Sequence, residues 1–150
     1  MILVREAESA DCDTIAHFQE KMAMETENLE LDPGIVGSGV NAVFSDPSKG
    51  KYYVAEKDKT IAGCLLTTAE WSDWRNGRII WIQSVYVLPE WRNKGIYKKL
   101  YNHIKQLVEE DPYLKGIRLY VDKTNEKAIQ IYQHCGMDDE HYKLFEWIRK

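Results

Sequence analysis

The sequence predicts a mixed α/β fold, as a single domain over residues 1–150. Apolar positions alternate between helical spacing and short strand-like runs along the whole chain. The first half holds strands separated by short turns, which favours a mostly antiparallel N-terminal sheet. The second half runs strand, helix, strand, which predicts a parallel C-terminal βαβ unit joined to that sheet. We therefore expect helices on both faces of one sheet.

Composition and charge exclude several classes of protein. The 150 residues are 44% hydrophobic and 29% charged, as in an ordinary globular domain, and the net charge of −4 argues against a general nucleic-acid binder. The cysteines Cys12, Cys64 and Cys135 are widely spaced and form no C-x-x-C pair, which favours neither a disulfide scaffold nor a zinc site. No signal peptide and no membrane-spanning run is apparent. We expect a cytoplasmic protein without a metal.

The first half of the chain predicts these elements in order. A strand at 2–7 leads to a helix from Ser9 or Asp11 to Met24. Asp32 and Pro33 then open a second helix. Residues 51–57 and 61–71 flank the turn KDKT as a β-hairpin. The almost continuously apolar run at 78–87 predicts a strand that is buried on both faces.

The second half alternates helices and strands. We expect a helix over 94–109 that ends at Asp111-Pro112, and a strand over 117–122. A helix follows over 125–136, with Gly136 as its C-terminal stop. The segment HYKLFEWI, at 141–148, predicts a closing strand.

The start of the 94–109 helix carries unexpected charges. Arg92 and Lys94 lie at the N-terminus of the predicted helix, where the helix dipole already gives a partial positive charge. Gly95 lies in the same turn. A phosphate at this end would explain all three residues, because exposed N–H groups and cations attract it and glycine lets the backbone approach it. A solvated helix start is the alternative. The known nucleotide patterns Gly-x-x-x-x-Gly-Lys-Ser/Thr and Gly-x-Gly-x-x-Gly are absent.

Two motifs resemble those of the GNAT superfamily of N-acetyltransferases. The pyrophosphate loop of that family, Gln/Arg-x-x-Gly-x-Gly/Ala, corresponds to Arg92 through Tyr97, with Tyr97 where a small residue is usual. The family pattern Asn-x-x-Ala-x-x-x-Tyr-x-x-x-Gly is met by Asn125, Ala128, Tyr132 and Gly136. The predicted order of helices and strands extends this resemblance over nearly the whole chain.

The resemblance implies acetyl-CoA as the donor and a primary amine of a small molecule or peptide as the acceptor, in direct attack without an acyl-enzyme. The pantetheine arm would contact backbone groups of Val85, Tyr86 and Val87. Asn125 would hold the cofactor arm or an ordered water. The residues implied for the pyrophosphate are Arg92, Asn93, Lys94, Gly95, Ile96, Tyr97 and Lys98.

Tyr132 is the candidate general acid. A phenol with a pKa of about 10 stays protonated at neutral pH and can give its proton to the departing CoA thiolate. Its place on an apolar helix face also fits a core tyrosine with a satisfied hydroxyl. The matching spacing of Asn125, Ala128 and Gly136 favours the catalytic interpretation.

The general base stays open at this point. Many members of the family place a glutamate in the long strand where this chain has Gln83, which cannot act as a base. Gln83 and Ser84 inside an apolar strand indicate either a lined cavity or satisfied core hydrogen bonds. The remaining candidate bases are Glu25, Glu27, Glu70 and Asp73.

The acceptor site is predicted from four residues: Glu25, Glu27, Trp74 and Gln83. Acidic residues at the first helix connection would attract a cationic amine, although such a loop is more often only solvated. Trp71 and Trp74, near a hairpin tip, would wall the acceptor pocket, cover the sheet or meet a second subunit in a homodimer. A non-catalytic acetyl-CoA-binding or interaction module with the same fold is the alternative function.

Overall fold

The computed structural model describes residues 1–150 as two compact units, Met1–Arg118 and Leu119–Lys150. The first unit contains β1 (Leu3–Glu6), η1 (Ser9–Asp11), α1 (Cys12–Glu27), α2 (Pro33–Ser45), β2 (Lys51–Lys57), β3 (Thr60–Ser72), β4 (Gly77–Val87), η2 (Pro89–Trp91), α3 (Ile96–Glu110) and β5 (Leu114–Arg118). The second unit contains α4 (Glu126–His134).

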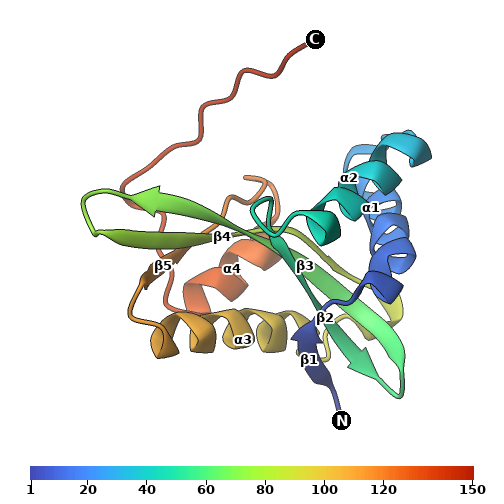
Figure 1. Cartoon of the computed structure of the whole chain (residues 1–150), viewed down its shortest axis with the longest axis horizontal. Coiled ribbons are helices and arrows are strands. Elements are labelled where there is room, and N and C mark those ends of the chain that lie inside the picture. Colours follow the sequence, from blue (N-terminus) through green and yellow to red (C-terminus); the bar gives the residue numbers. More distant parts are fainter. The chain divides into compact units, whose positions relative to one another are not determined.

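The sheet of the first unit has five strands in the order β1-β2-β3-β4-β5. Neighbouring strands pair antiparallel from β1 to β4, whereas β4 and β5 pair parallel. Helix α3 connects the two parallel strands, as Figure 1 shows. The predicted mixed α/β class, with an antiparallel N-terminal sheet and a parallel βαβ unit, is confirmed.

Two successive residues of β2 show that helices cover both faces of the sheet. The ring of Tyr52 stacks on Phe44 of α2, with centroids 5.7 Å apart, while the ring of Tyr53 lies 5.4 Å from His103 of α3. Successive side chains of a strand point to opposite faces. Helices α1 and α2, which lie side by side in Figure 1, therefore cover one face, and α3 covers the other.

The predicted start of α2 and the predicted turn between β2 and β3 are confirmed. Oδ1 of Asp32 accepts hydrogen bonds from the backbone N–H groups of Gly34 and Ile35, at 2.8 and 3.1 Å, and caps α2. Asp58 and Lys59, with φ of 51° and 66°, form the two-residue turn between β2 and β3. Two positive φ values in succession are those of the turn type that suits a twisted hairpin.

Strand β4 carries a bulge and continues beyond its parallel neighbour. Cys64 pairs with Tyr86 and Leu66 with Gln83, so β4 holds one more residue than β3 between these pairs. Ser84, at φ 54°, accommodates the extra residue. The last pair between β4 and β5 joins Trp81 to Arg118, where β5 ends. Within the first unit, β4 therefore extends from Ile82 to Val87 without a β5 partner.

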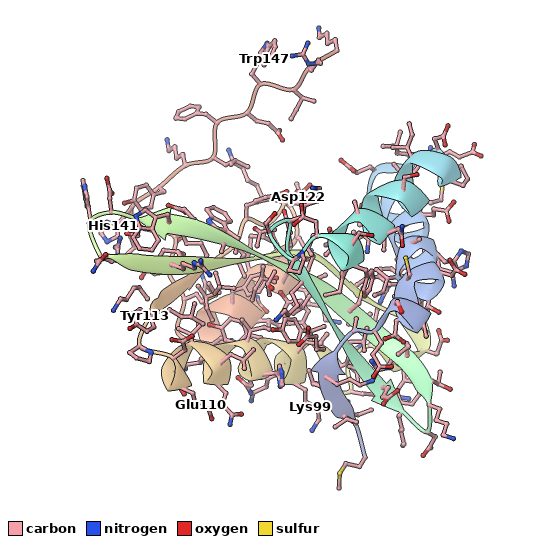
Figure 2. All side chains as sticks on the ribbon, viewed as in Figure 1. Lys99, Glu110, Tyr113, Asp122, His141 and Trp147 are labelled. Atoms are coloured by element: carbon pink, nitrogen blue, oxygen red, sulfur yellow. The ribbon has the colours of Figure 1, made fainter.

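Helix α3 is amphipathic. Leu100 and Ile104 are buried, while Lys99 and Glu110 point away from the sheet (Figure 2).

No helix in the chain is both long enough and apolar enough to cross a membrane.

Three predicted boundaries and one predicted strand require correction. Helix α1 ends at Glu27 rather than Met24. Helix α3 starts at Ile96 rather than Lys94, because Gly95 has a φ of 78° and serves as the N-cap. Strand β5 spans Leu114–Arg118 rather than 117–122. No strand forms at 141–148, where the chain after His141 is extended and carries Trp147 (Figures 1 and 2). Residues with strand propensity do not by themselves supply the hydrogen-bonded neighbour that a strand requires.

Candidate active site

The loop before α3 is shaped by two residues with left-handed backbone. Asn93 has a φ of 62° and Gly95 a φ of 78°. Left-handed residues in a short loop curve the backbone so that N–H groups face a concave surface, which suits an anion. A Cβ built on Gly95 would meet no atom within 4 Å, so the space above the helix start is open. The N-cap residue of α3 is Gly95, which has no side chain to bond the exposed N–H groups of the first turn. The geometry therefore fits the predicted phosphate position.

Cations surround this helix start, and one of them comes from elsewhere in the sequence. Nζ of Lys94 lies 5.2 Å from the centroid of the Trp91 ring, and Nζ of Lys57, at the end of β2, lies 5.7 Å from the same ring. Such cation–π contacts hold a lysine in place without neutralising it. The position of Lys57 beside Trp91 could not be predicted from the sequence, because no motif connects the end of β2 with the start of α3.

Arg92 is the centre of a polar cluster that connects three elements. Its Nε donates to the carbonyl of Val87 at 2.9 Å, and its Nη2 donates to Oε2 of Glu25 at 2.7 Å. Its guanidinium carbon lies 5.5 Å from the centroid of the Tyr86 ring. The hydroxyl of Tyr86 donates to Oε1 of Glu25 at 2.8 Å. The end of α1, the end of β4 and the loop before α3 therefore meet at one carboxylate.

The pKa values of this cluster follow from burial and from these hydrogen bonds. Burial alone would raise the pKa of Glu25, but the hydrogen bonds from Arg92 and Tyr86 and the charge of Arg92 outweigh it, so the pKa lies below its usual value. Burial is the largest cause that raises the pKa of Tyr86 to about 12, and the hydrogen bond to Glu25 is the next largest. At neutral pH Glu25 is therefore a carboxylate and Tyr86 a hydrogen-bond donor.

An open hollow of about 450 Å³ lies beside this cluster. Its lining combines carboxylates with apolar and aromatic surface and one lysine: Glu20, Lys21, Met24, Glu25, Tyr86, Pro89 and Glu90. Three carboxylates next to apolar surface suit a cationic group on an apolar stem. Among the residues predicted for the acceptor, the hollow includes Glu25, whereas Glu27, Trp74 and Gln83 do not line it.

The other predicted residues of β4 lie at the bulge. Tyr86 is buried and its ring packs 5.2 Å from that of Phe18 on α1, while Val85 and Val87 are partly exposed. A bulge turns a backbone group away from the ladder, so this stretch can offer an N–H to a ligand. Gln83, also partly exposed, pairs with Leu66 next to the bulge.

Glu70 is a poor candidate for the base. Its carboxylate accepts from Nε1 of Trp81 at 2.7 Å and from Nη1 of Arg118 at 3.1 and 3.0 Å. The hydrogen bond from Trp81, then those from Arg118, lower the pKa of Glu70 despite some burial, which weakens it as a proton acceptor. Asp73 lies at the β3–β4 turn and accepts from the backbone N–H of Trp74, which is 89% exposed.

The second unit gives the motif around α4 a local structural basis. Oδ1 of Asn125 caps the helix by accepting from the N–H of Ala128 at 3.1 Å. Gly136, at φ 87°, ends it, and the N–H of Met137 donates to the carbonyl of Tyr132 at 3.1 Å. Tyr132 itself is partly buried. Burial is the larger cause, and the electrostatic interaction with Cys135 the smaller one, that raises the pKa of its phenol above the usual value.

The sheet order and the candidate site together define a class of protein. It is a mixed α/β protein whose sheet changes from antiparallel to parallel pairing at β4 and whose crossover helix begins at a cationic, glycine-containing loop. The chain belongs to the acetyltransferase (GNAT) family, whose sequence profile matches residues 9–137. The predicted family and the prediction of an acyl-transferring enzyme are confirmed.

Relatives with known names agree with this family. Thialysine N-epsilon-acetyltransferase of Bos taurus is 28% identical over 147 residues, which cover 92% of this chain and 85% of that protein. N-alpha-acetyltransferase 50 of Danio rerio is 33% identical over 77 residues, which cover 48% of this chain and 46% of that protein. Both names describe transfer of an acetyl group to nitrogen.

Solved structures extend the similarity to the whole chain. A possible acetyltransferase from Clostridium difficile 630 shares 43% identity with a TM-score of 0.92, over 100% of this chain and 99% of that one. AAC(6')-Iy, solved with the bisubstrate analogue CoA-S-monomethyl-acetylneamine, shares 10% identity with a TM-score of 0.79, over 100% and 99% of the two chains. At that identity the similarity concerns the fold alone.

Proposed function

We propose that this protein transfers the acetyl group of acetyl-CoA to a primary amine of a small molecule or peptide. The observation that carries the proposal is the start of α3, which has a glycine N-cap and cations in the preceding loop, next to the part of β4 that continues past its last β5 partner. A helix N-terminus with cations around it attracts phosphate groups. A strand edge without a neighbour offers backbone groups to an extended pantetheine arm.

The cofactor-binding residues follow from this arrangement. Residues Arg92 through Lys98 would bind the pyrophosphate, and backbone groups of Val85, Tyr86 and Val87 would bind the pantetheine. A backbone N–H at the β4 bulge would stabilise the oxyanion that forms on the acetyl carbonyl. Asn125 uses its Oδ1 as a helix cap, so its amide N–H groups can donate to the cofactor arm or to a water.

The reaction needs three proton transfers. The acceptor ammonium loses a proton to a base, and the neutral amine attacks the acetyl carbonyl to form the C–N bond and the oxyanion intermediate, from which the C–S bond to CoA breaks. The departing thiolate takes a proton, for which Tyr132 is the proposed donor, and the amide nitrogen gives up its extra proton, which restores the phenol directly or through water. A phenol whose pKa is raised by burial stays protonated at neutral pH and is available as an acid.

Glu25 is the proposed acceptor-side carboxylate. It lies in the hollow with Glu20 and Glu90, where an ammonium would find opposite charge. It would bind the amine or take its proton through a water. Glu27, Trp74 and Gln83 remain predicted acceptor contacts. The names of the relatives, which include an N-epsilon-acetyltransferase, support an amine on a flexible stem as the acceptor class.

We propose that the protein is cytoplasmic and has neither nucleic acid nor membrane as a partner. Trp71 and Trp74, 60% and 89% exposed, provide surface on which a homodimer would form.

The test is release of free CoA thiol from acetyl-CoA with a panel of primary amines, together with thermal melts. We expect turnover with at least one cationic amine. Acetyl-CoA should raise the melting temperature more than pantetheine, which lacks the pyrophosphate. Equal shifts from both ligands would contradict a pyrophosphate site. Binding without turnover on any amine would favour the second candidate, a non-catalytic acetyl-CoA-binding module, which the absence of a strand glutamate at Gln83 motivates.

A further inference from the structure

The proposed pyrophosphate ligand Arg92 already holds a carboxylate. Nη2 of Arg92 lies 2.7 Å from Oε2 of Glu25, a residue 67 positions earlier in the chain. Its Nε is occupied separately by the carbonyl of Val87. Both N–H groups of Nη1 and one of Nη2 remain, so a phosphate that binds the two Nη atoms together has to share Nη2 with Glu25.

Carboxylate and phosphate compete for the same geometry. Both present oxygens that accept parallel hydrogen bonds from a guanidinium. The side chains of Arg92 and Glu25 are 41% and 37% exposed, and an ion pair this accessible to water is weak. A pyrophosphate carries more negative charge than a carboxylate, and the N–H groups at the start of α3 add to its binding. A phosphate that binds Arg92 through both Nη atoms therefore competes with Glu25 for Nη2.

Glu25 does not become unpartnered when Arg92 leaves. Its Oε1 accepts from the hydroxyl of Tyr86 at 2.8 Å, and Tyr86 is held rigidly because it is buried against Phe18. The carboxylate would keep this hydrogen bond and turn its second oxygen to the hollow. Glu20 and Glu90 line the same hollow, so the released charge would join two others.

We propose that Glu25 is an internal competitor for the pyrophosphate of acetyl-CoA: the cofactor displaces it from Arg92, and the released carboxylate completes a site for a cationic amine. The inference rests on the proposed function. It makes cofactor binding a condition for strong amine binding, because in the free protein the charge of Glu25 is neutralised by Arg92. It assigns Glu25 two roles that the sequence motifs do not indicate: competition with the pyrophosphate for Arg92, and binding of the cationic amine.

The experiment is isothermal titration of inorganic pyrophosphate and of acetyl-CoA into wild type, Glu25→Gln and Glu90→Gln. A neutral side chain at position 25 should hold Arg92 less strongly, so both ligands should bind about two- to fivefold more tightly to Glu25→Gln, as loss of an exposed ion pair implies. Glu90→Gln removes one negative charge from the same hollow, and Glu90 makes no ion pair with Arg92. Its affinities should stay near those of wild type.

A double-variant arm separates competition from simple charge removal. In an Arg92→Ala background, Glu25→Gln should no longer tighten binding, because no competition remains. Unchanged or weaker binding to Glu25→Gln, equal tightening in Glu90→Gln, or persistent tightening without Arg92 would each overturn the inference. Acetyl transfer plays no part in these readouts. Tightening in a protein that acetylates no amine would support the competition and contradict only the proposed enzyme activity, and turnover without tightening would do the reverse.

Discussion

Arg118 on β5 donates from Nη1 to both carboxylate oxygens of Glu70 on β3, at 3.1 and 3.0 Å, across the strand β4 that separates them. Trp81 of β4 donates to the same carboxylate and forms the last pair between β4 and β5 with Arg118. The three side chains therefore connect three strands at the point where the parallel pairing ends. We infer that they stabilise the point on β4 after which this strand has no β5 partner.

Glu70→Gln tests whether Glu70 is structural or catalytic. We expect a loss of about 1 kcal/mol in the free energy of unfolding, because the pair with Arg118 is partly exposed. The kcat on an amine identified by thiol release should stay within a few-fold of wild type. Denaturant melts and steady-state kinetics measure the two quantities. A large loss of kcat with unchanged stability would restore Glu70 as a candidate base.

Gly95→Ala tests the loop before α3, with Gly136→Ala as a matched control. Both glycines have positive φ, 78° and 87°, and an added Cβ meets no atom within 4 Å at either position. Each substitution should cost about 1–2 kcal/mol of stability from backbone strain. Only Gly95→Ala should weaken acetyl-CoA binding, since its Cβ would stand where the phosphate approaches. Equal affinities of the two variants in a calorimetric titration would argue against this loop as the pyrophosphate site.

Arg92→Glu places a negative charge at the same helix start. We expect acetyl-CoA to bind more weakly, because the new carboxylate repels the pyrophosphate and meets Glu25 as a like charge. Thermal melts should show a smaller stabilisation by acetyl-CoA than in wild type. A stabilisation equal to that of wild type would remove Arg92 from the cofactor site.

Tyr132→Phe tests the proposed acid. The ring and its packing on α4 remain, and only the hydroxyl is lost. If that hydroxyl protonates the thiolate, kcat should fall by about 10²–10⁴-fold while acetyl-CoA affinity changes little. If Tyr132 is a core residue, the variant should lose about 1 kcal/mol of stability and keep its rate. Kinetics alongside a denaturant melt decide between these outcomes, and a kcat near wild type would assign the proton to water.

Asp11→Asn tests a pH-dependent contribution to stability. The carboxylate of Asp11 accepts from Nη1 of Arg5 at 2.8 Å and from the N–H of Glu8 at 2.8 Å. The hydrogen bond from Arg5, which outweighs burial, lowers the pKa of Asp11 in the folded protein. The contribution is therefore present above the ordinary pKa of about 3.9 and is lost as the pH falls through the folded value. The stability gap between wild type and variant should close in acid.

The control for that experiment is Asp13→Asn, an exposed carboxylate in the first turn of α1 without an ion pair. Its stability should follow that of wild type at every pH in a series of thermal melts. A gap between wild type and Asp11→Asn that does not narrow as the pH falls into the acid range would mean that the substitution acts through packing rather than through the charge.

The sequence alone determined the elements that short-range chemistry controls. Asp32 and Pro33 predict the start of α2, because a carboxylate at this position caps the exposed N–H groups of the helix. The hairpin of β2 and β3 followed from its turn, and Gly136 marked the end of α4. The fold class, the family and the cationic loop before α3 were readable for the same reason: each is encoded by residues that are close together along the chain.

Tertiary structure alone decided which distant residues meet. The contact between Glu25 and Arg92 joins the end of α1 to a loop 67 residues later, and no spacing rule connects two such positions. Lys57 reaches Trp91 only because β2 ends near that loop, and the bulge at Ser84 exists only in relation to the register of β3. The sequence also could not supply a partner strand for residues 141–148, because pairing is a property of two segments. Local patterns specify faces and caps, whereas contacts between distant side chains depend on how the sheet and its helices pack.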